Sequence, residues 1–135
     1  MDEFHAFYTS LCSKATSVEE QALQLSESLS NTPDELIQQL QRIMYESADK
    51  FSTNCVDSPT FFDQGAPREF RVYIFKSLSP LLTNVISCAA LMRDVAEEPD
   101  NTHLLTSTQK RSTEELLRTS FDTLQQLENF AATLS

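Results

Sequence analysis

The residues that most often carry chemistry in proteins are few in this sequence and widely separated. It contains two histidines, His5 and His103, and three cysteines, Cys12, Cys55 and Cys88. Zinc sites usually take paired Cys or His ligands about two to five positions apart, and no such pair occurs here. A Cys–His nucleophile pair built on Cys12 or Cys55 is conceivable. Isolated residues of these types are more often packing or surface residues, so we expect neither a metal site nor a catalytic pair.

Acidic residues are plentiful, but their spacing does not suit proton transfer or metal binding. The adjacent pairs are Glu19-Glu20, Glu97-Glu98 and Glu114-Glu115. Neighbouring residues of a helix point to different sides, so the two carboxylates of a pair cannot share a proton or an ion. The Glu-x-x-His motif of di-iron bundles does not occur, and Gly65, the single glycine, excludes a glycine-rich phosphate loop. We therefore expect no enzymatic activity and no cofactor.

One short segment, residues 67–76, combines basic and aromatic side chains. These are Arg68, Phe70, Arg71, Tyr73, Phe75 and Lys76. Such a mixture can bind nucleic acid, but the whole chain has a net charge of −10, which repels phosphate groups and anionic lipid surfaces. We therefore expect no nucleic-acid ligand. The segment suits neutralisation of acidic neighbouring helices, or docking of an acidic segment of a partner.

The sequence also predicts the compartment. Its start, Met1-Asp2-Glu3, lacks the basic residues and apolar run of a signal peptide. An odd number of widely spaced cysteines indicates a reducing compartment, the cytosol or the nucleus. The longest uncharged stretch, residues 77–92, contains Pro80 and several polar residues, and it is too short and too polar to span a membrane. We therefore expect no direct membrane insertion.

Composition and periodicity predict one all-α domain. The chain has 135 residues, one glycine and no tryptophan, which is typical of helices joined by few tight turns. Apolar residues recur every third or fourth position, which predicts an antiparallel up-and-down four-helix bundle. The predicted helices cover roughly residues 2–30, 33–53, 67–96 and 102–134, with a loop at 54–66.

The first two predicted helices have clear apolar faces. The long first helix places Phe4, Phe7, Leu11, Ala15, Val18, Ala22, Leu25 and Leu29 in one stripe. The second presents Leu36, Leu40, Ile43, Met44, Ala48 and Phe51. We expect Thr32 to cap the second helix, with Pro33 in its first turn and Glu35 completing a capping box.

The third predicted helix is unusually apolar. Its stripe is Phe70, Ile74, Leu78, Leu81, Val85, Cys88, Met92 and Val95, which keeps helical phase across Pro80 and predicts one helix with a kink there. The alternative is that Ser79-Pro80 caps a fresh helix. Its other faces also carry apolar residues, including Leu82 and Ile86. Such a helix is either the central element of its own domain or is covered by a second chain.

Two regions leave alternatives open. The loop contains the adjacent aromatics Phe61 and Phe62, which either close one end of the bundle or anchor a partner. The last helix begins either near residue 102 or at Ser112, which offers a capping box with Glu115. Its predicted stripe is Leu116, Leu117, Phe121, Leu124, Leu127, Ala131 and Leu134.

These features predict a protein that binds other proteins without catalysing a reaction. The leading hypothesis is a small helical subunit or adaptor of a larger complex, forming homo- or hetero-oligomers with other helical proteins. The alternative is a peripheral trafficking or tethering factor that acts at an organelle surface through protein contacts. The candidate partner-binding residues are Phe61, Phe62, Arg68, Arg71, Tyr73, Phe75, Leu82 and Ile86.

Overall fold

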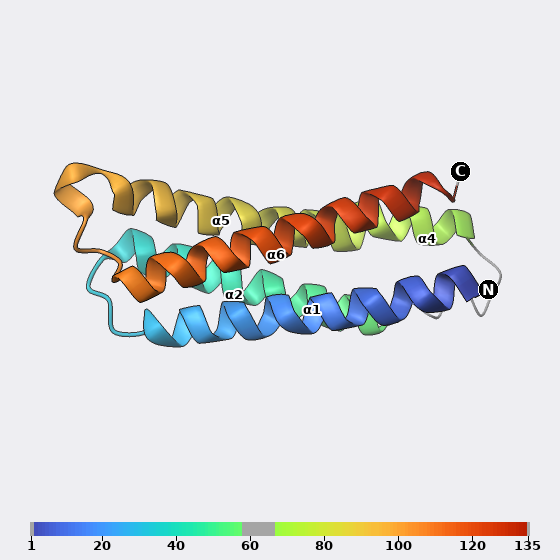
Figure 1. Cartoon of the computed structure of the whole chain (residues 1–135), viewed down its shortest axis with the longest axis horizontal. Coiled ribbons are helices and arrows are strands. Elements are labelled where there is room, and N and C mark those ends of the chain that lie inside the picture. The colour runs from blue at the N-terminus through green and yellow to red at the C-terminus, as the bar shows by residue number, and fades with distance from the viewer. Residues whose placement is uncertain (1, 58–66, 135) are drawn as a thin grey trace.

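The protein folds as an all-α, antiparallel, up-and-down four-helix bundle (Figure 1). The computed structural model describes residues 2–57 and 67–134. The helices are α1 (Asp2–Ser28), α2 (Glu35–Val56), α4 (Pro67–Tyr73), α5 (Ser79–Glu97) and α6 (Ser107–Ala132). A π-helical turn, Ile74–Leu78, joins α4 and α5 into one rod, and a short 3-10 turn, Pro99–Asn101, follows α5. The fold class predicted from the sequence is confirmed.

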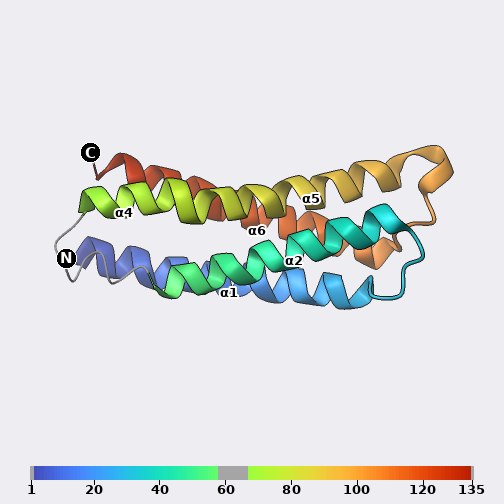
Figure 2. The same ribbon diagram turned by 180° about the vertical axis from the view of Figure 1, so that it is seen from behind.

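Each rod packs against two neighbours, so the bundle closes on itself. α1 lies against α2 and α6, and α5 lies against the same two helices. Figures 1 and 2 show the two faces of this arrangement, with the ends of α1 and α6 together at one end of the bundle. One continuous apolar core runs between the four rods.

The stripe predicted for α1 is the stripe that is buried. All eight of its apolar residues, from Phe4 to Leu29, lie in the core. Steps of three and four residues return a side chain to the same side of a helix, so a 27-residue helix turns one continuous edge inward. Burying each leucine of this stripe contributes about 1.5–3 kcal/mol.

Four phenylalanines close the core at the end that holds both termini. The rings of Phe7 in α1 and Phe130 in α6 stack at 3.8 Å between centroids. The Phe70 ring meets Phe4, Phe7 and Phe130 edge to face, at 5.7, 6.4 and 6.1 Å. This cluster ties α4 to α1 and α6.

The start of α2 differs from the prediction. The helix begins at Glu35 and its cap is Asp34, whose Oδ1 accepts a hydrogen bond from the Ile37 backbone N–H at 2.9 Å. Thr32 is therefore not the cap and Pro33 precedes the helix, because a carboxylate satisfies the free N–H groups and also suits the positive helix end. α2 continues to Val56. Its inner face uses Ile37, whereas Leu36 and Ile43 are exposed.

The third rod continues through Pro80, as predicted, and the irregularity lies immediately before the proline. Proline has no N–H to donate and its ring crowds the preceding turn. The wider π-helical turn Ile74–Leu78 accommodates it, with the Ser79 N–H donating to the Ile74 carbonyl. The Ser77 carbonyl accepts a hydrogen bond from Asn54 Nδ2 at 3.0 Å. The backbone distorted by the proline is thus supported by α2.

The π-helical turn also decides which residues enter the core. Phe70, Ile74, Leu78 and Leu82 follow at steps of four and are all fully buried. Leu81, expected in the core from regular α-helical spacing, is only partly buried. The prediction that Leu82 contacts a partner is therefore wrong, because the wider turn rotates this side chain inward.

α6 begins at neither of the two predicted positions. Thr106 caps it through a complete capping box, in which the Gln109 N–H donates to Thr106 Oγ1 at 3.1 Å and the Thr106 N–H donates to Gln109 Oε1 at 2.8 Å. The buried face also differs from the predicted stripe. It consists of Thr113, Leu116, Ser120, Thr123, Leu127 and Ala131.

The polar residues in this face offer a test of the packing. The hydroxyls of Thr113 and Thr123 donate to backbone carbonyls one turn earlier, both at 2.7 Å. The fully buried Ser120 Oγ has no hydrogen-bond partner among residues 2–57 and 67–134. We expect Ser120→Ala to raise the free energy of unfolding by about 1 kcal/mol, because it removes an unsatisfied buried group. Denaturant unfolding measures the change. Thr123→Val, which removes a bonded hydroxyl, should give no gain, and an equal gain in both variants would contradict the assignment.

Candidate protein-binding surface

The line where α5 meets α6 carries apolar side chains on the outside of the bundle. The Arg93 Nη1 of α5 pairs with Glu114 Oε1 of α6 at 3.5 Å, which marks this line on both helices. Seven residues along each helix from this ion pair stand Ile86 and Phe121. Because seven residues make about two helical turns, they occupy the same sides of α5 and α6 as the charged pair. An apolar pair thus replaces the ion pair at the next level of the bundle.

We call this surface the α5–α6 seam and define it by Ile86, Ala90, Leu117, Phe121 and Leu124. Phe121 is 58% exposed, and the other four are partly exposed. Ala90 and Leu117 flank the central pair toward the Arg93–Glu114 bridge, and Leu124 flanks it on the other side. A large aromatic residue at the centre of a partly apolar surface is the pattern of a binding hot spot.

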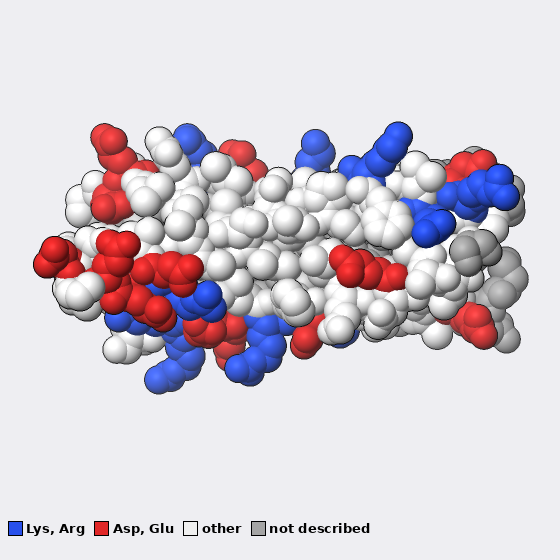
Figure 3. Space-filling model, turned by 90° about the horizontal axis from the view of Figure 1, so that it is seen from above, with Lys and Arg blue, Asp and Glu red and all other residues white. Residues whose placement is uncertain are grey.

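Figure 3 shows most of the charged side chains toward the two ends of this face, with a largely uncharged band between them that an acidic group interrupts. Near the start of α4 lie the exposed basic residues Arg68, Arg71 and Lys76, with Glu69 among them. At the far end of α5 lie the exposed acidic residues Glu97, Glu98 and Asp100. An apolar centre between charged ends favours protein contact, because the charges can orient a partner while the centre excludes water.

The residues predicted to bind a partner do not form one surface. Arg68, Arg71 and Phe75 are exposed on the first turns of the third rod. There the Arg71 guanidinium lies 5.8 Å from the centre of the Phe75 ring, a cation–π arrangement. Ile86 belongs to the seam. Phe61 and Phe62 lie outside the described residues.

Tyr73 has a structural role on the opposite side of the rod. Its hydroxyl donates to the Asn54 carbonyl of α2 at 2.9 Å. Burial, together with the nearby Asp57 and Cys55, raises the pKa of Tyr73. The side chain therefore helps to attach the π-helical turn to α2.

The sequence reasoning missed Phe121 as a surface residue. Leu117, Phe121 and Leu124 lie at helical spacing and were expected in the core. The buried stripe of α6 instead includes Thr113, Ser120 and Thr123, small side chains that allow close packing against the other helices. The threonines' regular spacing with Leu116 and Leu127 was the signal that could have revealed the correct face.

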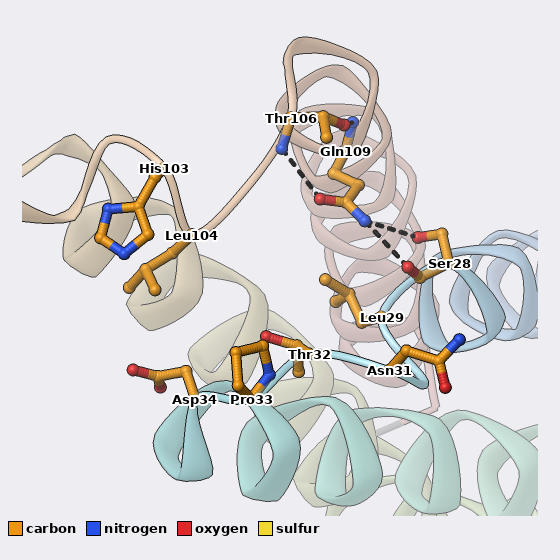
Figure 4. Close-up of a pocket in the computed structure, with 10 residues that line it drawn as sticks. All are labelled: Ser28, Leu29, Asn31, Thr32, Pro33, Asp34, His103, Leu104, Thr106 and Gln109. Atoms are coloured by element: carbon orange, nitrogen blue, oxygen red, sulfur yellow. Dashed lines mark hydrogen bonds between the residues drawn. The ribbon is translucent and has the colours of Figure 1, made fainter.

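A pocket of about 490 Å³ lies at the end of the bundle farthest from the termini (Figure 4). Residues of the α1–α2 turn and of the connection before α6 face one another across it. Gln109 Nε2 donates to the Ser28 carbonyl at 2.9 Å, while Gln109 Oε1 serves the capping box. The Asp34 carboxylate caps α2. The polar groups of this pocket thus hold the two connections together, which gives no reason to assign a ligand.

A cluster of tyrosine and cysteine side chains lies between α1 and α2. A hydrogen bond with Cys12, burial and the nearby Cys55 raise the pKa of Tyr8 to about 12. The Tyr8 hydroxyl also donates to the Val56 carbonyl at 3.3 Å. Burial, with a smaller effect of Cys12, raises the pKa of Cys55. Nucleophilic cysteines need a lowered pKa, so burial suits Cys55 to packing and not to nucleophilic chemistry.

This cluster predicts a loss of stability in alkali. The folded chain holds the Tyr8 proton more tightly than the unfolded chain, whose tyrosines have the ordinary pKa of 10.0. The resulting stabilisation is fully present below pH 10 and is lost as the pH rises through about 12. Burial of the Cys55 thiol also stabilises the fold below its ordinary pKa of 9.0, and this contribution is lost at higher pH. Denaturant unfolding from below pH 9 to pH 12 should show a decreasing free energy of unfolding. The decrease should be shallower in Tyr8→Phe than in the wild type. Equal decreases in the two proteins would contradict the role of Tyr8.

Two further features bear on function. Among residues 2–57 and 67–134, no three His, Cys, Asp or Glu side chains lie close enough together to hold a metal ion. One helix in this part of the chain, Pro67–Glu97, is long and apolar enough to cross a membrane, with a mean hydropathy of 1.4 in its most apolar stretch. Core helices of soluble proteins have the same property. Only 33% of the residues of that stretch are buried in the bundle, and the exposed large apolar residues of the helix are Val72, Phe75 and Leu91.

Comparisons with protein-family models, with curated proteins and with solved structures found no match.

Proposed function

We propose that this protein is a non-enzymatic protein–protein interaction module, a small helical subunit or adaptor of a larger complex. The observation that carries the proposal is the α5–α6 seam. The four helices already enclose a continuous core, yet Phe121 remains 58% exposed between Ile86 and Leu124. The exposed part of the Phe121 ring adds nothing to this core, so a contact outside the chain accounts for the apolar character of this residue.

The composition of the surrounding face supports the same proposal. Aromatic residues and arginine are enriched in protein interfaces, and lysine and acidic residues are depleted at their centres. Phe121 and Phe75 are both exposed, and the Arg71 guanidinium lies over the Phe75 ring. The partner that suits the face is a helical protein with an apolar stripe, because such a stripe can lie along the seam.

Affinity purification from the native cell tests the proposal. We compare the tagged wild-type chain with Phe121→Arg, and we use Ile43→Arg as the matched control because Ile43 is 45% exposed on α2, away from the seam. We expect Phe121→Arg to lose the proteins captured by the wild type, because a charge at the centre of the interface must be desolvated, while Ile43→Arg retains them. Capture of the same proteins by all three chains would show that the seam is not the binding surface.

A further inference from the structure

We propose that the outer side of α4 and the π-helical turn binds an acidic, amphipathic helical segment of another protein. This surface, which we call the basic stripe, consists of Arg68, Arg71, Val72, Phe75 and Lys76. It shares no residue with the α5–α6 seam, so this second surface goes beyond the proposed function.

Basic and apolar side chains are interleaved along the basic stripe. Its five residues stand at positions i, i+3, i+4, i+7 and i+8, which lie on one side of a helix. All five are exposed, including the apolar Val72 at 47% and Phe75 at 48%. Arg68 and Lys76 are separated by about 12 Å along the rod at 1.5 Å per residue. Two apolar side chains thus stand between cations at the two ends.

The bundle does not neutralise the three cations of the basic stripe. The sequence left two roles for them, neutralisation of acidic neighbouring helices or binding of an acidic partner segment. Among residues 2–57 and 67–134, the only ion pairs join Arg93 to Asp94 and to Glu114. The chain has 20 acidic and 10 basic residues, so the cations do not lack pairs because acidic side chains are scarce. Binding of an acidic partner segment is the role that this leaves.

Arg71 can bind a carboxylate while it stays in contact with Phe75. Its guanidinium lies over the Phe75 ring, 5.8 Å from the ring centre. A guanidinium that packs on a ring keeps its N–H groups available at its edge, where they can form two parallel hydrogen bonds with a carboxylate. Glu69 is the only acidic residue between positions 67 and 93. With three cations and this one carboxylate, the surface keeps a net charge of +2.

The inner side of the rod is attached to three other helices, so the basic stripe is held in place. Phe70 packs among aromatic rings of α1 and α6. The Tyr73 hydroxyl donates to the Asn54 carbonyl of α2, and Asn54 Nδ2 donates to the Ser77 carbonyl. A surface that is ordered before binding loses less conformational freedom when a partner binds.

A groove beside the basic stripe indicates what kind of segment fits. Its volume is about 430 Å³, and its lining within the described part of the chain is Arg68, Glu69, Val72, Tyr73, Lys76 and Ser77. Apolar side chains of an amphipathic helix can pack against Val72 and the Tyr73 ring. Carboxylates about eight residues apart on the same helix then match the spacing of Arg68 and Lys76.

Nucleic acid and anionic membranes are also negatively charged, but they suit the surface less well. The net charge of −10 on the whole chain repels a long polyanion and a charged membrane surface. A short peptide segment can stay within about 10 Å of the basic stripe, the distance over which salt screens other charges. Its apolar side chains also match Val72 and Phe75.

A synthetic peptide tests the ligand chemistry. The probe is an alanine-based helical peptide with two central leucines one turn apart and glutamates on either side of them. The matched peptide has glutamine in place of each glutamate. Titration calorimetry should show that the glutamate peptide binds and that the glutamine peptide binds at least about tenfold more weakly. Equal affinities, or no binding of the glutamate peptide, would overturn the proposal.

Charge reversal in the protein locates the binding surface. Arg68→Glu with Lys76→Glu should weaken binding of the glutamate peptide at least about tenfold, because attraction becomes repulsion. The matched control is Arg42→Glu with Lys50→Glu on α2, where both residues are also exposed. It changes the net charge equally and should alter the affinity less than about twofold, because salt screens distant charges. Equal losses in the two double variants would show that the peptide responds only to net charge, and the basic stripe would be wrong.

Two further variants separate the basic stripe from the seam. Phe75→Ala should weaken peptide binding at least about fivefold, as expected of an aromatic contact at an interface, whereas Phe121→Arg should not change it. The reverse result would place the peptide on the seam and refute this inference. A peptide that does not bind at all leaves the proposed function standing, because that function is tested through Phe121.

The same charge-reversed protein distinguishes the other anionic ligands. The probes are phosphatidylserine–phosphatidylcholine vesicles and single-stranded polyuridylate RNA. The wild type should bind neither at physiological salt. Binding of either probe that is lost in Arg68→Glu with Lys76→Glu would assign the basic stripe to that ligand and overturn the acidic segment.

Discussion

Replacing Phe70 by alanine is expected to lower the free energy of unfolding by about 4 kcal/mol. The side chain is fully buried, and its ring contacts Phe4, Phe7 and Phe130 edge to face at 5.7 to 6.4 Å. Phe70 is also the only buried residue of α4. Its removal therefore opens a cavity among the other three rings and releases the apolar contact that holds α4 against α1 and α6.

Urea unfolding followed by circular dichroism measures this effect. Phe75→Ala is the matched control, because Phe75 lies on the same rod and is 48% exposed. We expect the control to change the free energy of unfolding by less than about 1 kcal/mol. Equal losses in the two variants would mean that Phe70 is not at the centre of an aromatic cluster.

The second large effect is expected at Leu82. Counted from Phe70 and Ile74, regular α-helical spacing favours Leu81 over Leu82 for the core. The π-helical turn changes this phase, and Leu82 is fully buried in register with the inner face of α5. Leu82→Ala should therefore lower the free energy of unfolding by about 3 kcal/mol, from the lost transfer of the side chain and the cavity that remains. Thermal and denaturant unfolding of the same protein give two measures of this loss.

The control for Leu82 lies one turn further along α5. Ile86 is only partly buried on the seam, so Ile86→Ala should cost less than about 1.5 kcal/mol while weakening association. Leu82→Ala should show the opposite pattern, with low stability and intact association at a temperature where it is folded. If Leu82→Ala weakens association and leaves stability unchanged, its side chain faces a partner and the described phase of the helix is wrong.

The sequence was sufficient to predict the fold class and the inner face of α1. All eight predicted residues of α1 are buried, because the helix is regular and its apolar residues alternate at steps of three and four. The residue that caps α2 could not be predicted with the same accuracy. Thr32 and Asp34 are both good caps, and their order of preference depends on how the chain leaves α1.

The phase of the third rod depended on an irregularity that spacing alone does not reveal. Pro80 indicated a disturbance, but a kink, a fresh helix start and a π-helical turn were all consistent with it. Only the π-helical turn keeps residues four positions apart, from Phe70 through Leu78 to Leu82, on the buried side of the rod. The exchange of Leu81 for Leu82 follows from this single feature.

The candidate surface was predicted only in part. Ile86 lies on the seam, whereas Arg68 and Arg71 are exposed on α4, Leu82 is in the core and Tyr73 binds α2. Phe121 was missed because the α6 core tolerates Ser120 and Thr123, so the more apolar stripe of that helix is not the more buried one. Hydrophobicity ranks residues by type, but the geometry of the neighbouring helices decides which stripe is covered.

Hydroxyl-radical footprinting of Phe121 tests the central claim most directly, since the extent of its oxidation reports how far solvent reaches the ring. We compare the assembled protein isolated from its native cell with the dilute purified chain, and use the exposed Ile43 and Val56 of α2 as internal references. If the seam binds protein, oxidation of Phe121 falls several-fold in the assembled state while both references are unchanged. Equal oxidation of Phe121 in the two states would contradict the account.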